Sequence, residues 1–247
     1  MINFSETLIR SSSVGYLMTE PQSKADKEAG LLSKTAQRHL TEVYIAAKYG
    51  RTKEVQTKQM KKGILVEDDS IVVLSKYLDK HFVKNQERFS NGFITGHPDI
   101  IDVSHDGITI YDIKSSYDLF TFLSNLNDKL DSLYYWQMMS YMWLTGAKKA
   151  YIAFCLVDTP ESIVQQEKYY LLKNMDVVSE ESPEYLAQAA LLEKNLTFGD
   201  IDFSERVLLF PVERNEDDIL KIGNKVVEAR KFLHNINELH MNFNFKK

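Results

Sequence analysis

Apolar residues recur at helical spacing in the first third of the chain. The pattern predicts one helix over Gly30–Tyr49, ended by Gly50, and a second over Glu54–Leu78. The opening, through Ala29, is polar and is predicted to be rich in loops. The chain therefore begins its regular structure with helices.

The densest strand signal lies between His81 and Ser116, where runs of Ile, Val and Phe are broken by Asn-Gly and Asp-Gly dipeptides. Such dipeptides are typical of hairpin turns between strands. A two-residue turn at Asp106-Gly107 is one possibility, and a four-residue loop over Ser104–Gly107 is another. Either turn predicts an antiparallel hairpin.

The rest of the pattern alternates between helices and strands. A glycine at position 146 marks a helix end. In chain order, the pattern predicts helices over Tyr117–Asn127 and Asp131–Leu144, a strand over Lys149–Val157, a helix over Pro183–Asn195, a strand over Val207–Val212 and a helix over Glu216–Leu239. These elements predict an α/β fold with a central mixed sheet flanked by helices. We expect one domain over residues 1–247, with a core at about 30–160 and a C-terminal elaboration at about 160–247.

The amino-acid composition excludes several classes of protein. The hydrophobic share of 44% is ample for a buried core, and no apolar run is long enough to cross a bilayer. The single cysteine, Cys155, excludes an internal disulfide and a four-cysteine zinc or iron–sulfur site. The N-terminus lacks the pattern of a signal peptide. These features predict a cytoplasmic protein that has no membrane partner.

Charge is unevenly distributed along the chain. The formal net charge is −5, but the stretch Arg51–Lys62 holds five basic residues and a single acidic one. The stretch Asp176–Asp218 is strongly acidic. Phosphate contacts depend on the local field more than on the total charge. The composition therefore permits a nucleic-acid partner.

Two carboxylates and one lysine share a face of the predicted hairpin. Asp112 and Lys114 alternate on one strand, and Asp99 lies on the preceding strand. The two-residue turn sets Asp99 opposite Lys114, and the four-residue loop sets it opposite Asp112. In both registers the three side chains point the same way, although a three-residue loop would separate them.

Charged groups on a half-buried face need a partner. A hard divalent cation such as Mg²⁺ prefers carboxylate oxygens, water and phosphate. A bound metal can activate water, and Lys114 beside it could position or help deprotonate that water and offset charge on phosphorus. The alternative is a surface hairpin with an ordinary ion pair, since an Asp-x-Lys sequence alone is common. The position of Asp99 across the hairpin favours a catalytic centre.

Further candidates come from the flanking helices. Glu67 falls in the apolar stripe of the helix predicted over Glu54–Leu78, where a carboxylate needs a partner; otherwise it lies at the margin of an acidic patch. Lys61 and Lys62 precede it and could lead phosphates towards the site, or form a solvated helix face. Gln137 and Tyr141 stand four residues apart on one face of a later helix.

Together these motifs resemble the RecB-type branch of the PD-(D/E)xK nucleases. The matching segments, in order, are G63-I-L-V-E67, G96-H-P-D99-I-I-D102, D112-I-K114 and Q137-M-M-S-Y141. The glutamate form of the first motif is similar to lambda-exonuclease-like and YqaJ-like phage enzymes. The resemblance covers about residues 61–146.

The resemblance implies a restriction-endonuclease-like core and hydrolysis of phosphodiester bonds that depends on Mg²⁺ or Mn²⁺. Glu67, Asp99 and Asp112 would be the metal ligands and Lys114 the catalytic lysine. Gln137 and Tyr141 would support the site or contact DNA. Asp102 should face away from Asp99 and serve the structure.

The resemblance also frames the choice of function. It favours a DNA exonuclease from a phage or mobile element, acting in recombination or DNA processing in the host cytoplasm. A recombinase or single-strand annealing protein is a candidate partner. Arg10 and Ser13 weakly resemble a segment that binds a terminal phosphate. Alternatives are an endonuclease that uses the same centre, or a DNA-binding or assembly protein that keeps the fold without cleaving.

Overall fold

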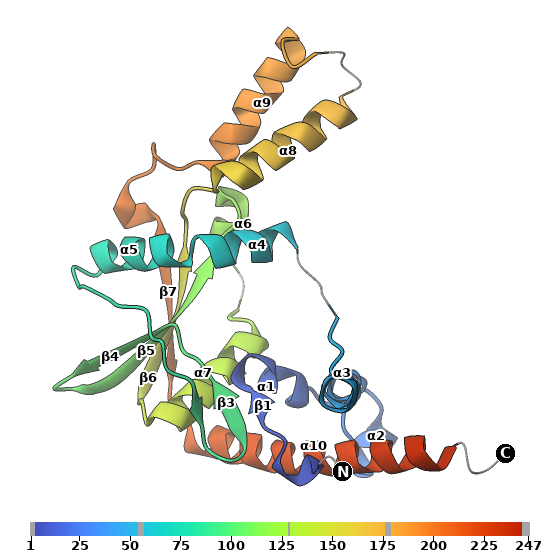
Figure 1. Ribbon diagram of the computed structural model, residues 1–247. Coiled ribbons are helices and arrows are strands. Elements are labelled where there is room, and N and C mark those ends of the chain that lie inside the picture. Colours follow the sequence, from blue (N-terminus) through green and yellow to red (C-terminus); the bar gives the residue numbers. More distant parts are fainter. Residues whose placement is uncertain (1–2, 54–56, 128, 176–178, 244–247) are drawn as a thin grey trace.

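A mixed four-stranded sheet forms the centre of the computed structural model, which describes residues 3–53, 57–127, 129–175 and 179–243. Its strands, in spatial order, are β4 (Ile100–Ser104), β5 (Gly107–Ser115), β6 (Lys149–Cys155) and β7 (Val207–Glu213). Strand β5 runs antiparallel to β4 and parallel to β6, and β7 runs antiparallel to β6. The predicted mixed sheet is confirmed (Figure 1).

A second, three-stranded sheet brings the N-terminal residues next to the hairpin. The order is β1 (Ile9–Arg10), β3 (Ile94–Gly96) and β2 (Phe89–Ser90). Strand β1 pairs parallel with β3, and β2 pairs antiparallel with it. A short 3-10 helix, Phe4–Glu6, precedes β1. Ile9 and Arg10 are therefore held close to the loop that carries Asp99.

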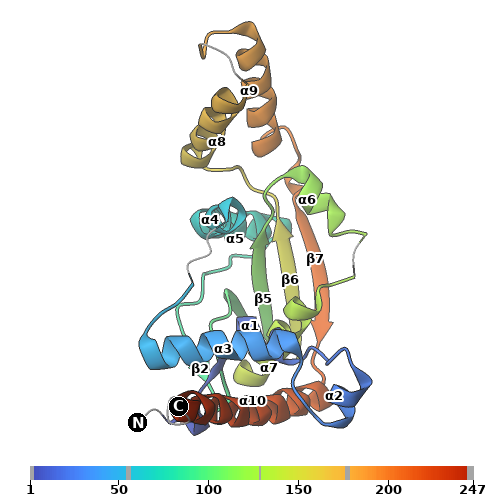
Figure 2. The same cartoon turned by 90° about the vertical axis from the view of Figure 1, so that its right-hand side faces the viewer.

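Helices cover both faces of the central sheet, as predicted (Figures 1 and 2). One face carries α1 (Ser11–Leu17), α3 (Lys34–Tyr49), α7 (Ser132–Thr145) and α10 (Glu216–Phe243). The opposite face carries α5 (Glu67–Tyr77). The other helical segments are α2 (Lys24–Glu28), α4 (Lys58–Leu65), α6 (Leu119–Ser124), α8 (Glu161–Asn174), α9 (Pro183–Leu196) and a 3-10 helix at Phe203–Glu205. Among the described helices, none has the length and apolar character needed to span a membrane.

Side chains alternate along β5 between two separate cores. Ile108 and Ile110 pack into the larger core, on the α7 side. Tyr111 and Ile113 pack into the smaller core, on the α5 side. This alternation follows from the two-residue period of a strand. The larger core draws on residues well before 30 and well after 160, including Leu17 and Leu233.

The helical pair α8 and α9 projects beyond α4 and α6, away from α10 (Figures 1 and 2). At its base Val164 and Leu196 pack against Tyr117. Helix α9 agrees with the helix predicted over Pro183–Asn195, whereas α8 was not predicted.

The register of the β4–β5 hairpin is the one given by the longer loop. Ser104 pairs with Gly107, and Ile101 pairs with Ile110. Of the two turns that the sequence leaves open, the two-residue turn at Asp106-Gly107 is excluded, because Gly107 is already the first residue of β5. Its φ of 115° lies in a region that L side chains rarely adopt, which explains the glycine.

The helix predicted over Glu54–Leu78 is divided at Val66, and residues 54–56 lie outside the described part of the chain. The amide of Val66 donates to the Lys62 carbonyl at the end of α4, and its carbonyl accepts from the Ser70 amide at the start of α5. Val66 itself is buried. The division makes Glu67 the first residue of α5, whereas the pattern placed it inside a continuous helix.

The prediction of a loop-rich opening is wrong for residues 11–17. These residues form α1, which packs tightly on α7. A Cβ on Gly15 would lie 2.8 Å from the Leu133 Cα, so the two helix backbones approach closely. Helix α1 is built from small residues, and a hydrophobic pattern does not detect such a helix.

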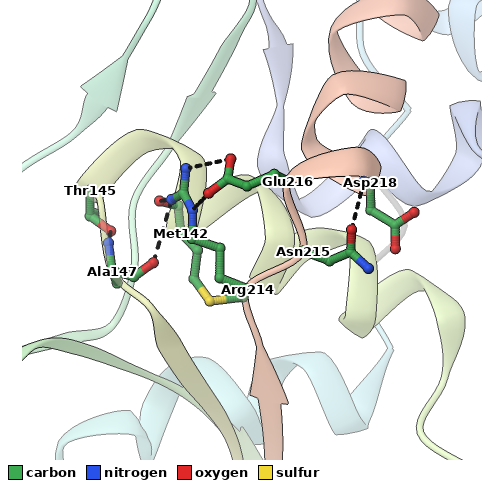
Figure 3. Close-up of polar contacts among 7 residues, drawn as sticks. All are labelled: Met142, Thr145, Ala147, Arg214, Asn215, Glu216 and Asp218. Atoms are coloured by element: carbon green, nitrogen blue, oxygen red, sulfur yellow. Dashed lines mark hydrogen bonds and ion pairs between the residues drawn. The ribbon is translucent and has the colours of Figure 1, made fainter.

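Arg214 fixes the C-terminal end of α7 to the junction between β7 and α10 (Figure 3). Its guanidinium donates to the carbonyls of Met142 and Ala147, and Glu216 accepts from it at 2.6 Å. The Asn215 side chain accepts from the Asp218 amide in the first turn of α10. The Met142 carbonyl also accepts from the Gly146 amide, so Arg214 adds a second donor at the end of α7. These contacts hold the helix that presents Gln137 and Tyr141.

We predict that Gly15→Ala lowers the free energy of unfolding by about 1–3 kcal/mol, the usual cost of overpacking, although Ala favours helices. Gly199→Ala is the matched control, because a Cβ at Gly199 would meet nothing within 4 Å. Denaturant unfolding of both variants measures the effect. Equal midpoints for the two variants would show that the α1–α7 contact is looser than described.

Candidate active site

One carboxylate, Asp112, and one lysine, Lys114, interrupt the apolar face of β5. Asp112 is 1% exposed, on the same face as Ile110. Lys114 Nζ lies 2.5 Å from Asp112 Oδ2. That oxygen accepts no well-aligned hydrogen bond within the described chain. A carboxylate buried with one ion pair and one side-chain hydrogen bond is costly, and functional sites are where proteins tolerate such groups.

Asp99 lies beside Asp112, as the observed hairpin register requires. Its Oδ2 accepts from the Ile113 amide at 2.7 Å. Burial and the nearby charge of Asp112 raise the pKa of Asp99 to about 8. Two carboxylates that share a poorly solvated site oppose each other's ionisation. A cation between them would remove this opposition.

Lys114 keeps its charge in this setting. Burial would lower the pKa of its ammonium, but the charge of Asp112 and the contact with that carboxylate outweigh burial, so the net shift is upward. Its Nζ also lies 5.0 Å from the centre of the Tyr134 ring. Lys114 is therefore a hydrogen-bond donor and a positive charge at neutral pH, and not a free base.

A hydrogen-bonded chain ties Asp112 to α7 and to the loop after β3. Gln137 Nε2 donates to Asp112 Oδ1 at 3.2 Å and to the Tyr141 hydroxyl at 2.9 Å. Tyr141 in turn donates to the His97 carbonyl at 3.2 Å. A Cβ on Gly96 would lie 2.8 Å from the Tyr141 ring, so this close approach needs a glycine. These linked hydrogen bonds fix the orientation of the Asp112 carboxylate.

Glu67 reaches the site from the first turn of α5. Its Oε2 lies 2.8 Å from Lys84 Nζ, an ion pair that the sequence did not predict. Its negative charge contributes to the raised pKa of Asp99. In this arrangement the Glu67 carboxylate is paired with Lys84.

The six residues proposed from the motifs line one cleft of about 600 Å³. They are Glu67, Asp99, Asp112, Lys114, Gln137 and Tyr141. In the ranges that the structure describes, no three His, Cys, Asp or Glu side chains lie close enough together to form a ready-made metal site. The oxygens of Asp99 and Asp112 nevertheless fit a hard cation, because they are carboxylate donors and a single lysine offsets their negative charge only in part.

The basic residues proposed for phosphate binding lie elsewhere. Lys62 is fully buried, which contradicts that prediction, because its Nζ donates to the Tyr117 carbonyl at 2.9 Å. The buried Ser13 hydroxyl donates to the Arg10 carbonyl at 3.0 Å, so it is not available to a phosphate in this arrangement. Arg10 lines a separate cavity, and Lys61 is exposed on α4.

Asp102 faces away from the site. Its carboxylate lies 2.5 Å from Lys80 Nζ, and its neighbours on β4 alternate between the two cores. The ion pair fits the structural role expected for Asp102.

Sequence reasoning did not assign Tyr134 or Lys84 to the site. Tyr134 stands three residues before Gln137 on α7 and lines the same cleft, so helical spacing could have identified it. Lys84 lies far from Glu67 in the sequence, and only the fold brings the two together.

Comparison with known proteins decides the family. The model of the PD-(D/E)XK nuclease superfamily matches residues 10–233. The chain belongs to the PD-(D/E)XK nuclease superfamily. The resemblance inferred from four short motifs is thereby confirmed, and the match extends well beyond them on both sides. No curated protein matches the sequence.

Solved structures of the same fold span nearly the whole of this PD-(D/E)XK nuclease. A phage-related exonuclease from Haemophilus somnus 129PT is 27% identical, with a TM-score of 0.73 over 96% of this chain and 98% of that one. An alkaline exonuclease from Laribacter hongkongensis is 12% identical, with a TM-score of 0.61 over 98% and 95%. The restriction-endonuclease-like fold expected from the motifs is confirmed.

Lys62 provides a pH-dependent test of the packing next to the site. Burial lowers the pKa of its ammonium to about 8, below the ordinary value of 10.5. Between these pH values the unfolded chain binds more protons, so folding stability rises with pH. Relative to Lys62→Met, the wild type should gain up to about 1.4 kcal/mol per pH unit above about pH 8.

Urea unfolding of both proteins at about pH 7.5 and about pH 10 measures this gain, because other titrating groups cancel in the comparison. Relative to Lys61→Met, a substitution on the exposed face of α4, the wild type should show no such gain in stability. Parallel pH curves for the wild type and Lys62→Met would contradict the burial of a charged Lys62.

Proposed function

We propose that this nuclease is a metal-dependent DNA exonuclease, with its centre on Asp99, Asp112 and Lys114. The observation that carries the proposal is the pair of carboxylates, Asp112 buried and Asp99 half-buried, beside the side chain of Lys114 in an open cleft. Such a pair is destabilising without a ligand and becomes useful when a divalent cation and a phosphate occupy the cleft.

Asp99 and Asp112 would hold the cation, and Glu67 at the cleft wall would complete the set of oxygen donors. Mg²⁺ or Mn²⁺ bound there would polarise the phosphoryl group and lower the pKa of a coordinated water. Oxygen-only ligands favour these hard ions over softer transition metals.

Lys114 would act on the substrate directly. Its ammonium would donate hydrogen bonds to the attacking water or to a non-bridging phosphate oxygen, and would offset charge that develops on phosphorus. Gln137 would keep Asp112 oriented, with Tyr141 holding Gln137 against the His97 carbonyl. Tyr141 and Gln137 are therefore positioning residues.

The choice of an exonuclease rests on the relatives. The phage-related exonuclease matches this chain along almost the full length of both proteins. The Laribacter enzyme is named an alkaline exonuclease, and it has also been solved in complex with dAMP, at 14% identity and a TM-score of 0.60. These names support DNA as the substrate and a mononucleotide as the product. A recombinase or single-strand annealing partner stays a prediction from the resemblance.

We predict that Lys114→Ala slows digestion of end-labelled linear duplex DNA at least about a hundredfold, since it removes a charge-assisted donor at the reacting phosphate. Lys80→Ala is the matched control, because Lys80 pairs with Asp102 away from the cleft. The wild type should digest linear DNA with Mg²⁺ or Mn²⁺ and should stop with EDTA.

Covalently closed circular DNA separates the alternatives in the same assay. Circular DNA that stays intact supports the exonuclease. The end from which the label is lost first gives its polarity. Cleaved circles would favour the endonuclease. Absence of cleavage with every metal would favour a DNA-binding protein that does not cleave, and undiminished digestion by Lys114→Ala would disprove the proposed centre.

We predict that Mg²⁺ or Mn²⁺ raises the melting temperature of the wild type by several degrees but leaves that of Asp99→Asn unchanged. A ligand at a hundred times its Kd adds about 2.7 kcal/mol to the folded state. Thermal unfolding with and without metal measures the shift. Asp102→Asn should retain it, because that carboxylate faces Lys80. An equal shift in Asp99→Asn would place the metal elsewhere.

A further inference from the structure

A second cavity, of about 470 Å³, adjoins the catalytic cleft. The two share the side chains of Asn125, Tyr134 and Phe154 as a common wall. The second cavity continues past this wall to Phe210 and Lys129. It is therefore an extension of the cleft along the sheet, away from Glu67.

Three aromatic rings line this extension. Phe154 and Phe210 meet edge to face, with ring centres 5.6 Å apart, and Phe154 meets Tyr134 edge to face at 6.1 Å. Edge-to-face contact leaves ring surface uncovered, and Tyr134 and Phe210 are only partly buried. The cavity can therefore offer aromatic surface to a planar ligand.

The rings stand on rigid elements next to the catalytic lysine. Phe154 on β6 is the register partner of Lys114 on β5. Phe210 lies on the neighbouring strand β7, paired with Ile152. Tyr134 projects from α7, and its ring is 5.0 Å from the Lys114 ammonium. A phosphate at Lys114 would therefore have aromatic surface one side chain away.

The charges around the extension suit a nucleotide. Lys129 is exposed at its edge and supplies a positive charge. Asp131, also in the lining, is engaged as the N-cap of α7, where its carboxylate accepts from the Leu133 amide at 2.8 Å. A ligand that reaches both parts of the cleft needs an anionic group for Lys114 and a planar group for the rings.

We propose that this extension is a nucleobase subsite, which stacks the base of a nucleotide next to the scissile phosphate on Tyr134, Phe154 and Phe210. The inference rests on the proposed nuclease function and adds the recognition of a base to it. Stacking is tolerant of sequence, because every base has an aromatic face. The subsite would hold the end of the strand in register for repeated cleavage without selecting a sequence.

The test uses linear DNA with one abasic nucleotide placed in turn at each of the first few positions from the cleaved end. The wild type should slow about tenfold when the abasic position reaches the subsite, the scale of a lost base–aromatic stack. Phe210→Leu removes a ring that lines only the extension. This variant should digest intact DNA more slowly and show a much smaller abasic effect.

A matched control changes the opposite face of the same strand. Leu209 neighbours Phe210 but packs into the smaller core, so Leu209→Ala alters β7 without touching the subsite. It should keep the full abasic effect. Melting temperatures of both variants show whether they are folded.

A second measurement does not depend on cleavage. Binding of a deoxynucleoside 5′-monophosphate and of 2-deoxyribose 5-phosphate is compared by calorimetry. The nucleotide should bind about tenfold more tightly to the wild type, and Phe210→Leu should lose that preference.

The outcomes separate the subsite from the function on which it rests. Digestion with no abasic effect and no preference for the nucleotide would overturn the subsite and leave the nuclease intact. Absence of digestion together with a nucleotide preference that Phe210→Leu removes would uphold the subsite and overturn the proposed activity. An abasic effect that Phe210→Leu leaves unchanged would place the base elsewhere.

Discussion

The structure of the site depends on one unfavourable interaction, the approach of the Asp99 and Asp112 carboxylates at the edge of the larger core. Burial and mutual repulsion raise the pKa of Asp99 to about 8. The Lys114 ammonium, the Ile113 amide and the Gln137 side chain compensate for part of this cost. The part of the free-energy cost that remains is offset when a divalent cation binds, because carboxylate oxygens such as those of Asp99 and Asp112 are the ligands it requires.

The surrounding fold holds these groups in place against their repulsion. At Asp112 and Lys114, strand β5 is paired with β6 on one side, and on the other side the Ile113 amide donates to the Asp99 carboxylate, so the two side chains cannot turn away from the cleft without breaking these contacts. Helix α7 presses Gln137 and Tyr141 onto the site, and Arg214 anchors the end of that helix (Figure 3). Catalytic groups on rigid elements lose little entropy on meeting a substrate. The same helix contributes the Tyr134 ring to the aromatic extension, so the proposed metal centre and the proposed nucleotide contacts would share one support.

Much of the site could be predicted from the sequence, because alternate residues of a strand face the same side of the sheet. Asp99, Asp112 and Lys114 share a face in both hairpin registers that the sequence leaves open, so this prediction did not depend on the type of turn. The position of Glu67 was less predictable, because the helix break depends on the burial of Val66 by the folded chain. The prediction for Lys62 was wrong for a similar reason. The local charge indicated a solvated helix face, whereas tertiary packing buries the Lys62 side chain. Helix α1 escaped detection because its contact with α7 rests on small residues.

Crystals grown with Mn²⁺ would test the central claim directly, through the anomalous scattering of the metal. We expect a single strong anomalous peak in the cleft, within coordination distance of carboxylate oxygens from both Asp99 and Asp112, and its loss in Asp99→Asn. Such a peak would show that the carboxylate pair is a metal centre. A fully occupied Mn²⁺ bound elsewhere, with Asp112 still paired to Lys114 alone, would contradict the assignment of these buried carboxylates to catalysis.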